Sequence, residues 1–269
     1  MRKIFSIEKT SKDLLTKEWR DLLFSKEPSL ELKRIRKEGM LPQELKELIG
    51  TPQDERFHPE GDVWSHTMLS IDAAADIIRR EELEGDDALV VMLATLCHDF
   101  GKPETTEKKE GHWRAYGHGK AGEGPTRSFL SNLEIGEKLK KRIVPLVVRH
   151  MFPLNAEAGD SAIRRLIKKL EPATIRELVL VSEADIRGTS RSNPDLSLLK
   201  KLMKKAKKIK NKAEKPEQIL QGRHLIEMGW KPGKIFGEIL SAVYEAQLQG
   251  KVTNLEEAKE MAKKIKSNF

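Results

Sequence analysis

The stretch ALVVMLATLCHDFGKPE, residues 88–104, is almost entirely apolar for ten positions and then places a histidine beside an aspartate. A segment that is apolar on every side is expected to form a central helix that other helices cover. His98 and Asp99 would lie at the C-terminal end of this helix, and Gly101 would end it. Burying such a pair costs desolvation energy, so the pair needs a partner that offsets the loss. We expect that partner to be a metal ion.

The composition favours an all-α fold. Charged residues make up 34% of the 269 residues and apolar residues 38%, which is typical of globular proteins, while aromatic residues reach only 5%. Apolar residues recur at spacings of three and four, and strict alternation is hard to find. The expected helical segments include residues 29–37, 63–80, 88–97, 139–150, 161–170, 172–185 and 241–248.

Three regions are expected along the chain: an N-terminal helical segment (1–50), a central metal-binding domain (51–190) and a basic helical region (191–269). Within the centre, residues 104–128 are rich in glycine and charge, which indicates one or two long loops. Pro145 should interrupt the helical segment around it, and Pro172 suits the first turn of the next one.

The basic region contains nine lysines and one acid between residues 200 and 215. Its apolar residues fall on one helical stripe, which predicts an amphipathic helix. The lysines could form a solvated face over a core, or they could contact nucleic acid, which the net charge of +8 also permits. The stripe consists of Leu199, Leu202, Met203, Ala206 and Ile209.

The single cysteine, Cys97, cannot form an internal disulfide, and its apolar neighbours predict a buried thiol. The charged N-terminus lacks the apolar core of a signal peptide, and no stretch is long enough to span a bilayer. These features predict a cytoplasmic protein with no membrane role.

Histidines and aspartates recur near the ends of the central helical segments and in the glycine-rich stretch. Imidazoles and carboxylates from separate helices are what a helical bundle supplies to a metal ion that it encloses. This donor set suits Mn, Ni, Co, Fe or Zn, and suits Mg less well. Asp99 could bridge two ions, so one or two ions are both open. The candidate ligands are His66, His98, Asp99, His118, His150 and Asp185.

The stretches HPEGDVWSHTMLSID, LCHDFGK, YGH, RHM and EADIRG resemble the successive motifs of the HD-domain phosphohydrolase superfamily. The form they resemble is the C-terminal half of bacterial CCA-adding tRNA nucleotidyltransferases, and the similarity extends over about residues 28–265. The resemblance implies an HD-domain helical bundle with additional N- and C-terminal helices. No glycine and serine followed by paired aspartates precede the domain, so we expect the nucleotidyltransferase half to be missing.

By this resemblance His66, His98, Asp99 and Asp185 match the core metal ligands. His118 and His150 match the additional histidines of two-metal members, and Lys102 matches a lysine that faces substrate phosphate. Arg187 could bind phosphate bidentately or pair with a carboxylate.

The implied activity is hydrolysis of phosphomonoesters or cyclic 2′,3′-phosphodiesters, on nucleotides or RNA 3′ ends, through attack by metal-bound water. Asp99 and Lys102 would be the catalytic residues, and Lys102 and Arg187 would contact the substrate. Two alternatives are a tRNA-binding module that docks through its basic C-terminal region and a partner subunit of a separate nucleotidyltransferase. The oligomeric state does not follow from the sequence.

The remaining polar residues of interest have simpler interpretations. His58 is expected to be a turn residue, because proline follows it. Glu60 and Asp62 could hold the loop or cap the helix that begins near Trp64. His112 and Trp113 could stack on a base, although an exposed loop histidine is the simpler interpretation.

Overall fold

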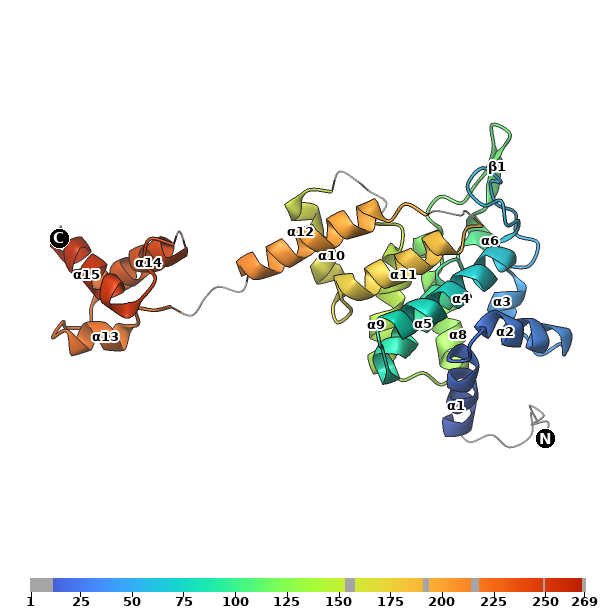
Figure 1. Ribbon diagram of the computed structural model, residues 1–269, viewed down its shortest axis with the longest axis horizontal. Coiled ribbons are helices and arrows are strands. Elements are labelled where there is room, and N and C mark those ends of the chain that lie inside the picture. The colour runs from blue at the N-terminus through green and yellow to red at the C-terminus, as the bar shows by residue number, and fades with distance from the viewer. Residues whose placement is uncertain (1–11, 153–157, 191–193, 214–217, 249, 268–269) are drawn as a thin grey trace. The chain divides into compact units, whose positions relative to one another are not determined.

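The computed structural model describes residues 12–152, 158–190, 194–213, 218–248 and 250–267, and its fold is all-α as predicted (Figure 1). Within these residues the strands form one antiparallel hairpin, β1–β2. In chain order the elements are α1 (Lys12–Leu23), α2 (Pro28–Lys37), α3 (Gln43–Lys46), α4 (Val63–Arg80), α5 (Gly85–Cys97), α6 (Lys102–Thr105), β1 (Glu107–Lys109), β2 (His112–Arg114), α7 (His118–Ala121), α8 (Glu123–Asn132), α9 (Glu137–Arg149), α10 (Asp160–Leu170), α11 (Ile175–Arg187), α12 (Ser197–Ala213), α13 (Gly222–Glu227), α14 (Lys234–Leu248) and α15 (Leu255–Lys266).

The chain divides into two compact units, residues 1–207 and 208–269. The division falls within α12, whereas the sequence suggested a boundary near residue 191. In the first unit α2 packs on α4, and α3 packs on α8.

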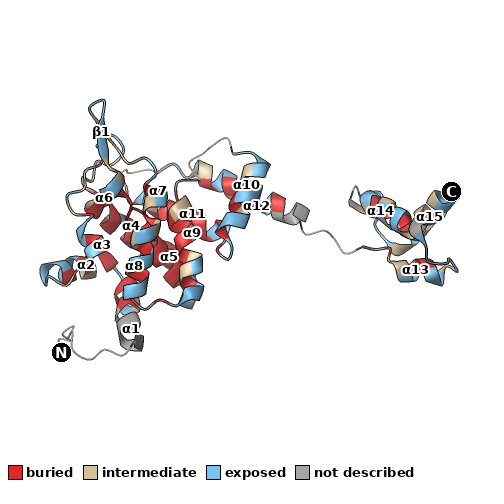
Figure 2. Ribbon diagram, turned by 180° about the vertical axis from the view of Figure 1, so that it is seen from behind, coloured by how far each residue is buried: buried red, intermediate tan, exposed pale blue. Residues whose placement is uncertain are grey.

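Helix α5 is the centre of the first unit, as its all-apolar sequence predicted. Every residue from Ala88 to Cys97 is buried, and α4, α9 and α11 pack around the helix (Figure 2). Cys97 is fully buried, and burial raises the pKa of its thiol. The expectation of a buried thiol is confirmed.

Helix α4 begins where the sequence predicted. The side chain of its N-cap residue, Asp62, accepts a hydrogen bond from the backbone N–H of Ser65 at 2.9 Å. Its second oxygen accepts from the N–H of Gly50 at 2.7 Å. Asp62 therefore caps α4 and also ties the preceding loop to its start.

Helix α11 begins later than predicted. Pro172 lies before the helix, whose first residue is Ile175. Thr174 is the N-cap, and its side chain and that of Glu177 form a reciprocal capping box. The T-x-x-E spacing is a helix-start signal that the sequence interpretation overlooked.

The prediction of long loops over residues 104–128 was wrong. The segment contains α6, the β1–β2 hairpin, α7 and the start of α8. Two of its glycines, Gly119 and Gly122, lie close to other backbone: a Cβ on Gly119 would lie 2.9 Å from the carbonyl oxygen of Val148 on α9. Helix α9 also runs unbroken through Pro145, which costs it a backbone hydrogen bond without ending it.

The amphipathic stripe of α12 is largely buried, since Leu199, Leu202, Ala206 and Ile209 are each less than 9% exposed. In the second unit α13, α14 and α15 surround an apolar core of their own, which includes Leu225. None of the helices in the described part of the chain is both long and apolar enough to cross a membrane.

Candidate metal centre

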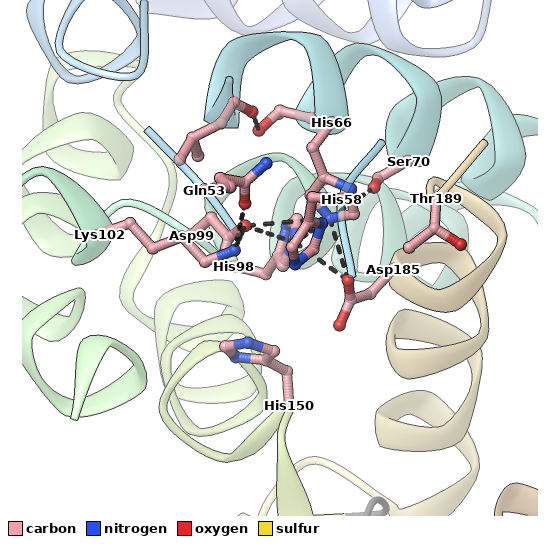
Figure 3. Close-up of polar contacts among 12 residues, drawn as sticks. Gln53, His58, His66, Ser70, His98, Asp99, Lys102, His150, Asp185 and Thr189 are labelled. Atoms are coloured by element: carbon pink, nitrogen blue, oxygen red, sulfur yellow. Dashed lines mark hydrogen bonds and ion pairs between the residues drawn. The ribbon is translucent and has the colours of Figure 1, made fainter. Parts of the chain in front are cut away.

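Six side chains from separate elements converge at the C-terminal end of α5. They are the six candidate ligands from the sequence, and their ligand atoms fall into two groups of three. The elements that carry them are α4 for His66, the end of α5 for His98 and Asp99, the start of α7 for His118, the end of α9 for His150 and α11 for Asp185. Figure 3 shows five of them: His66, His98, Asp99, His150 and Asp185.

The first group, which we name the His66 group, consists of His66, His98 and Asp185. The two imidazole Nε2 atoms are 3.3 Å apart. Asp185 Oδ1 lies 3.0 Å from Nε2 of His66 and 3.6 Å from Nε2 of His98. Three potential ligand atoms thus point to one small volume.

The second group, which we name the His118 group, consists of Asp99, His118 and His150. The two Nε2 atoms are 3.0 Å apart, and Asp99 Oδ1 lies 3.5 Å from Nε2 of His118. The other oxygen of Asp99, Oδ2, lies 3.2 Å from Nε2 of His98. The Asp99 carboxylate therefore faces both groups, one oxygen toward each.

Backbone carbonyls determine the tautomer of three of the histidines. Each Nδ1 lies 2.6 to 2.7 Å from the carbonyl oxygen three residues earlier. A carbonyl only accepts, so Nδ1 carries the proton and the neutral ring presents its Nε2 lone pair to the centre. The pairs are His98 with Thr95, His118 with Ala115 and His150 with Val147.

The fourth histidine is oriented by a carboxylate. Nδ1 of His66 lies 2.9 Å from Oε1 of Glu60, and the same oxygen lies 2.9 Å from Nδ1 of His58. Hydrogen bonds from both imidazoles hold the pKa of Glu60 well below its usual range, despite the opposing effect of burial. Glu60 therefore presents a negative charge to the outer side of His66, as carboxylates often do behind metal-binding histidines.

The donor atoms fit divalent metal ions. Two pairs of Nε2 lone pairs face each other at 3.3 and 3.0 Å, which is unfavourable unless a proton or a cation lies between them. Neither oxygen of the buried Asp99 has a hydrogen-bond partner of suitable geometry among the described residues. Imidazole and carboxylate together are the ligands of Mn, Fe, Co, Ni and Zn ions.

The electrostatics of the His66 group favour positive charge. Burial alone would lower the pKa of His98, but Asp99 and Asp185 outweigh it and raise this pKa to about 10. Burial likewise opposes the raised pKa of His66, which Asp185 and Glu60 produce. Without a metal, this group holds a proton at neutral pH.

The His118 group has the opposite balance. Burial, and then the charges of His98 and His118, lower the pKa of His150 to about 4. Burial opposes ionisation of Asp99, but His98 and Lys102 hold its pKa well below the usual value. This group therefore offers a neutral imidazole and an ionised carboxylate at neutral pH.

Two glycines allow the helices that carry the ligands to approach. A Cβ on Gly101 would lie 2.0 Å from the carbonyl oxygen of His118, and one on Gly188 would lie 2.0 Å from Oγ of Ser70 on α4. With φ of −89°, Gly101 does not adopt the left-handed conformation of a helix-ending glycine. The role predicted for Gly101 was wrong: it is needed for close contact with α7.

A cavity of about 670 Å³ lies over the centre, within the roughly 300–1,000 Å³ usual for small-molecule sites. Lys102 lines it, with Nζ 2.7 Å from Oδ2 of Asp99 and 2.6 Å from Oε1 of Gln53 (Figure 3). The lysine is thus a buried cation beside the shared carboxylate.

Arg187 is placed differently from the other candidate residues. It is not among the residues that line the cavity, and its Nε donates to Oε1 of Glu183 at 2.7 Å. Of the two alternatives that the sequence left open, carboxylate pairing is the one seen. Substrate contact by Arg187 stays a prediction.

Sequence reasoning did not assign a role in the centre to Gln53 or Glu60. Gln53 precedes His66 by 13 positions and has no recognisable motif of its own. Glu60 was interpreted as a loop or cap residue, and its carboxylate indeed receives Ser190 N–H at 3.3 Å in addition to the imidazoles. Only the three-dimensional contacts reveal that it orients His66.

Comparison with known proteins agrees with this geometry. Residues 63–188 match the HD domain family. The chain is 33% identical over 150 residues to the multifunctional CCA proteins of Mannheimia succiniciproducens and Pasteurella multocida. The alignments cover 54% of this chain and 35% and 34% of those relatives, so the chain spans about a third of their length. Residues 63–188, which contain all six converging side chains, are an HD domain like that of the CCA proteins.

Proposed function

We propose that the protein is a metal-dependent phosphohydrolase that acts on nucleotides or on phosphates at RNA ends. The HD superfamily consists of metal-dependent phosphohydrolases, and its domains bind divalent metals. The observation that carries the proposal is the pair of facing ligand groups beneath a cavity that also presents Lys102.

In this proposal His66, His98 and Asp185 would hold one ion, and His118 and His150 would hold a second. Asp99 lies between the two groups and would be a ligand that they share. When bound, divalent ions lower the pKa of water toward ~7 and withdraw charge from phosphoryl oxygens.

Lys102 is suited to bind the phosphate. An ammonium group has three N–H donors. Lys102 donates one of them to Gln53 and forms an ion pair with Asp99 at 2.7 Å. A remaining N–H can donate to a phosphoryl oxygen in the cavity and stabilise the charge that develops during hydrolysis. Gln53 then positions the lysine, since its amide oxygen is held 2.6 Å from Nζ.

The substrate class rests on the similarity to the CCA-protein domain, whose motifs resemble those of this chain. Nucleotide monophosphates and 2′,3′-cyclic nucleotides are the first substrates to test. Hydrolysis should be lost in chelator and return when Mn, Ni or Co is added, with released phosphate as the measurement. Hydrolysis that persists in chelator would reject the proposal.

Lys102→Ala should lower turnover by about 100-fold while metal content stays at the parent value, because the lysine contacts phosphate and not the ions. Lys120→Ala is the matched control. Its side chain is 78% exposed on α7, and it pairs with Glu123 away from the cavity. Equal turnover in both variants would contradict the role of Lys102.

RNA contact through the C-terminal region is a second candidate function. The six lysines of α12 up to residue 208 are all exposed, while the apolar stripe beneath them is covered. Replacing four of them by glutamine should weaken tRNA binding and flatten its dependence on salt concentration, as measured by filter binding. The lysines are Lys200, Lys201, Lys204, Lys205, Lys207 and Lys208.

A further inference from the structure

The mouth of the cavity is unusually rich in exposed apolar side chains. Seven large apolar side chains are exposed in the described residues, and three of them line this one cavity. Tyr116 is 70% exposed, Phe57 52% and Met151 45%. Trp113 lines the same cavity from β2. We name Phe57, Trp113 and Tyr116 the aromatic rim.

Each ring of the aromatic rim has a cation beside it. Cζ of Arg56 lies 5.6 Å from the Phe57 ring centroid. Nζ of Lys108 lies 5.6 Å from the ring of Trp113. Nζ of Lys109 lies 5.9 Å from the ring of Tyr116. All three separations are within the range of cation–π attraction.

A further positive charge faces the cavity from the hairpin. Arg114 follows Trp113 on β2 and lines the cavity, and its guanidinium has no hydrogen-bond or ion-pair partner among the residues that the structure describes. Figure 1 shows the hairpin extending from the helical body of the first unit. The mouth thus combines flat aromatic faces with several positive charges.

This combination indicates the chemistry of the ligand. A phosphate group alone is far smaller than a cavity of about 670 Å³ and would not contact the rim. Aromatic faces interleaved with cations bind nucleotide units, because every base offers a π face and every linkage a negative charge. Base and phosphate would then be held in one cavity, with the phosphate next to Lys102.

From these contacts we infer that the aromatic rim is a base-stacking subsite, which holds the nucleobase attached to the phosphate over the metal centre. The inference rests on the proposed function for the position of the phosphate. It adds that the protein selects nucleotides over sugar phosphates of the same charge, and that the selecting residues are Phe57, Trp113 and Tyr116.

The test compares adenosine 5′-monophosphate with ribose 5-phosphate, which carry the same phosphate and differ in the base. The whole chain is kept in chelator, so that binding is measured without turnover. Calorimetry gives the two dissociation constants, and tryptophan fluorescence reports stacking, because Trp113 lines the cavity. The parent should bind the nucleotide at least tenfold more tightly and show quenching with that ligand alone.

Tyr116→Ala and Phe57→Ala should each reduce the gap between the two ligands, which is the ratio of their dissociation constants, by about tenfold. This is the effect expected for the loss of one stacking contact. Tyr116→Phe, which retains the ring, should restore the gap. Leu30→Ala is the matched control, since Leu30 is 55% exposed on α2 and does not line the cavity.

A parent that binds both ligands equally, or that binds neither, would overturn the inference. So would a gap that persists in both Tyr116→Ala and Phe57→Ala. Base-dependent binding without any metal-dependent hydrolysis would reject the proposed function and retain the subsite. If the protein hydrolyses nucleotides and ribose 5-phosphate equally and binds them equally, the proposed function is retained and the base-stacking subsite is rejected.

Discussion

The His66 group and the His118 group present the same ligand types but hold them differently. His66 and Asp185 lie within the long helices α4 and α11, whereas His118 begins the four-residue helix α7 and His150 follows the last residue of α9. Glu60 adds a carboxylate behind His66, but the rings of the His118 group rest on backbone carbonyls. The first group should therefore bind its ion more tightly.

The two groups also differ in what an ion must displace. The raised pKa of about 10 for His98 means that the His66 group gives up a proton when it binds a metal at neutral pH. The lowered pKa of about 4 for His150 means that this histidine of the His118 group is already neutral. In the His66 group, therefore, the stronger negative charge favours metal binding, whereas the proton that must be released opposes it.

Removing the carboxylate that both groups share should have the largest effect. Asp99→Ala should lose both ions and lower hydrolysis by more than the ~100-fold upper range for a residue that only orients a ligand. Asp185→Ala, the matched variant, should lose the ion of the His66 group alone. Elemental analysis after dialysis measures both. Retention of one tightly bound ion by Asp99→Ala would show that the carboxylate is not shared.

Removing a ligand from the weaker group alone should have a smaller effect. His150→Ala should reduce the metal content from two ions per chain to one, because the ligands of the His66 group remain in place. His224→Ala on α13 is the control for loss of a histidine. Titration that saturates at one ion in both the parent and His150→Ala would reject the two-ion arrangement and leave a single-ion centre.

Changing the residue behind His66 should have a smaller effect still. Glu60→Gln keeps an oxygen that can accept from Nδ1 of His66 but removes the charge, so the affinity of the His66 group should fall about tenfold. The metal affinity of the His118 group should stay unchanged. Glu55→Gln, in the same loop and exposed, is the control. Equal metal affinity in Glu60→Gln and the parent would show that the charge does not matter.

The difference between what the sequence predicted and what it missed has a physical basis. The continuous apolar run from Ala88 to Cys97 requires burial on all sides, so a central helix follows from it directly. The capping role of Asp62 also follows from local chemistry. The six ligand candidates were predicted from their positions near helix ends or in the glycine-rich stretch and from the resemblance to the HD motifs, and the structure brings all six together.

What the sequence did not predict depends on contacts between distant segments. Glycine density at residues 104–128 indicated loops, but Gly119 and Gly122 lie where α7 comes close to other backbone, and a Cβ there would crowd Val148 and Gly101. The contacts of Gln53 with Lys102, and of Glu60 with His66, join a loop to the helices and leave no periodic signal. The aromatic rim, likewise, joins Phe57 to a hairpin more than fifty residues later in the chain.

The smallest expected effect concerns how the His66 group is supported, since Asp62 caps the helix that carries His66. Asp62→Ala should destabilise the protein by about 1 kcal/mol at pH 7, because two backbone N–H groups lose their acceptor. Burial opposes ionisation of Asp62, but the bonds from Ser65 and Gly50 lower its pKa below the usual 3.8. When folding lowers the pKa of a group, the group stabilises the folded protein fully at pH values above its pKa in the unfolded chain. This contribution is lost as the pH falls toward the lower pKa of the folded state.

The difference in melting temperature between parent and Asp62→Ala, measured in chelator, should therefore be about 2–4 °C at pH 7 and should shrink below pH 3.8. Asp62→Asn separates charge from capping, because its amide oxygen still accepts from Ser65 but does not titrate. Its difference from the parent should likewise shrink as the parent carboxylate is protonated. A penalty for Asp62→Ala that is equal at pH 7 and pH 3 would show that Asp62 stabilises the start of α4 through its hydrogen bonds and not through its charge.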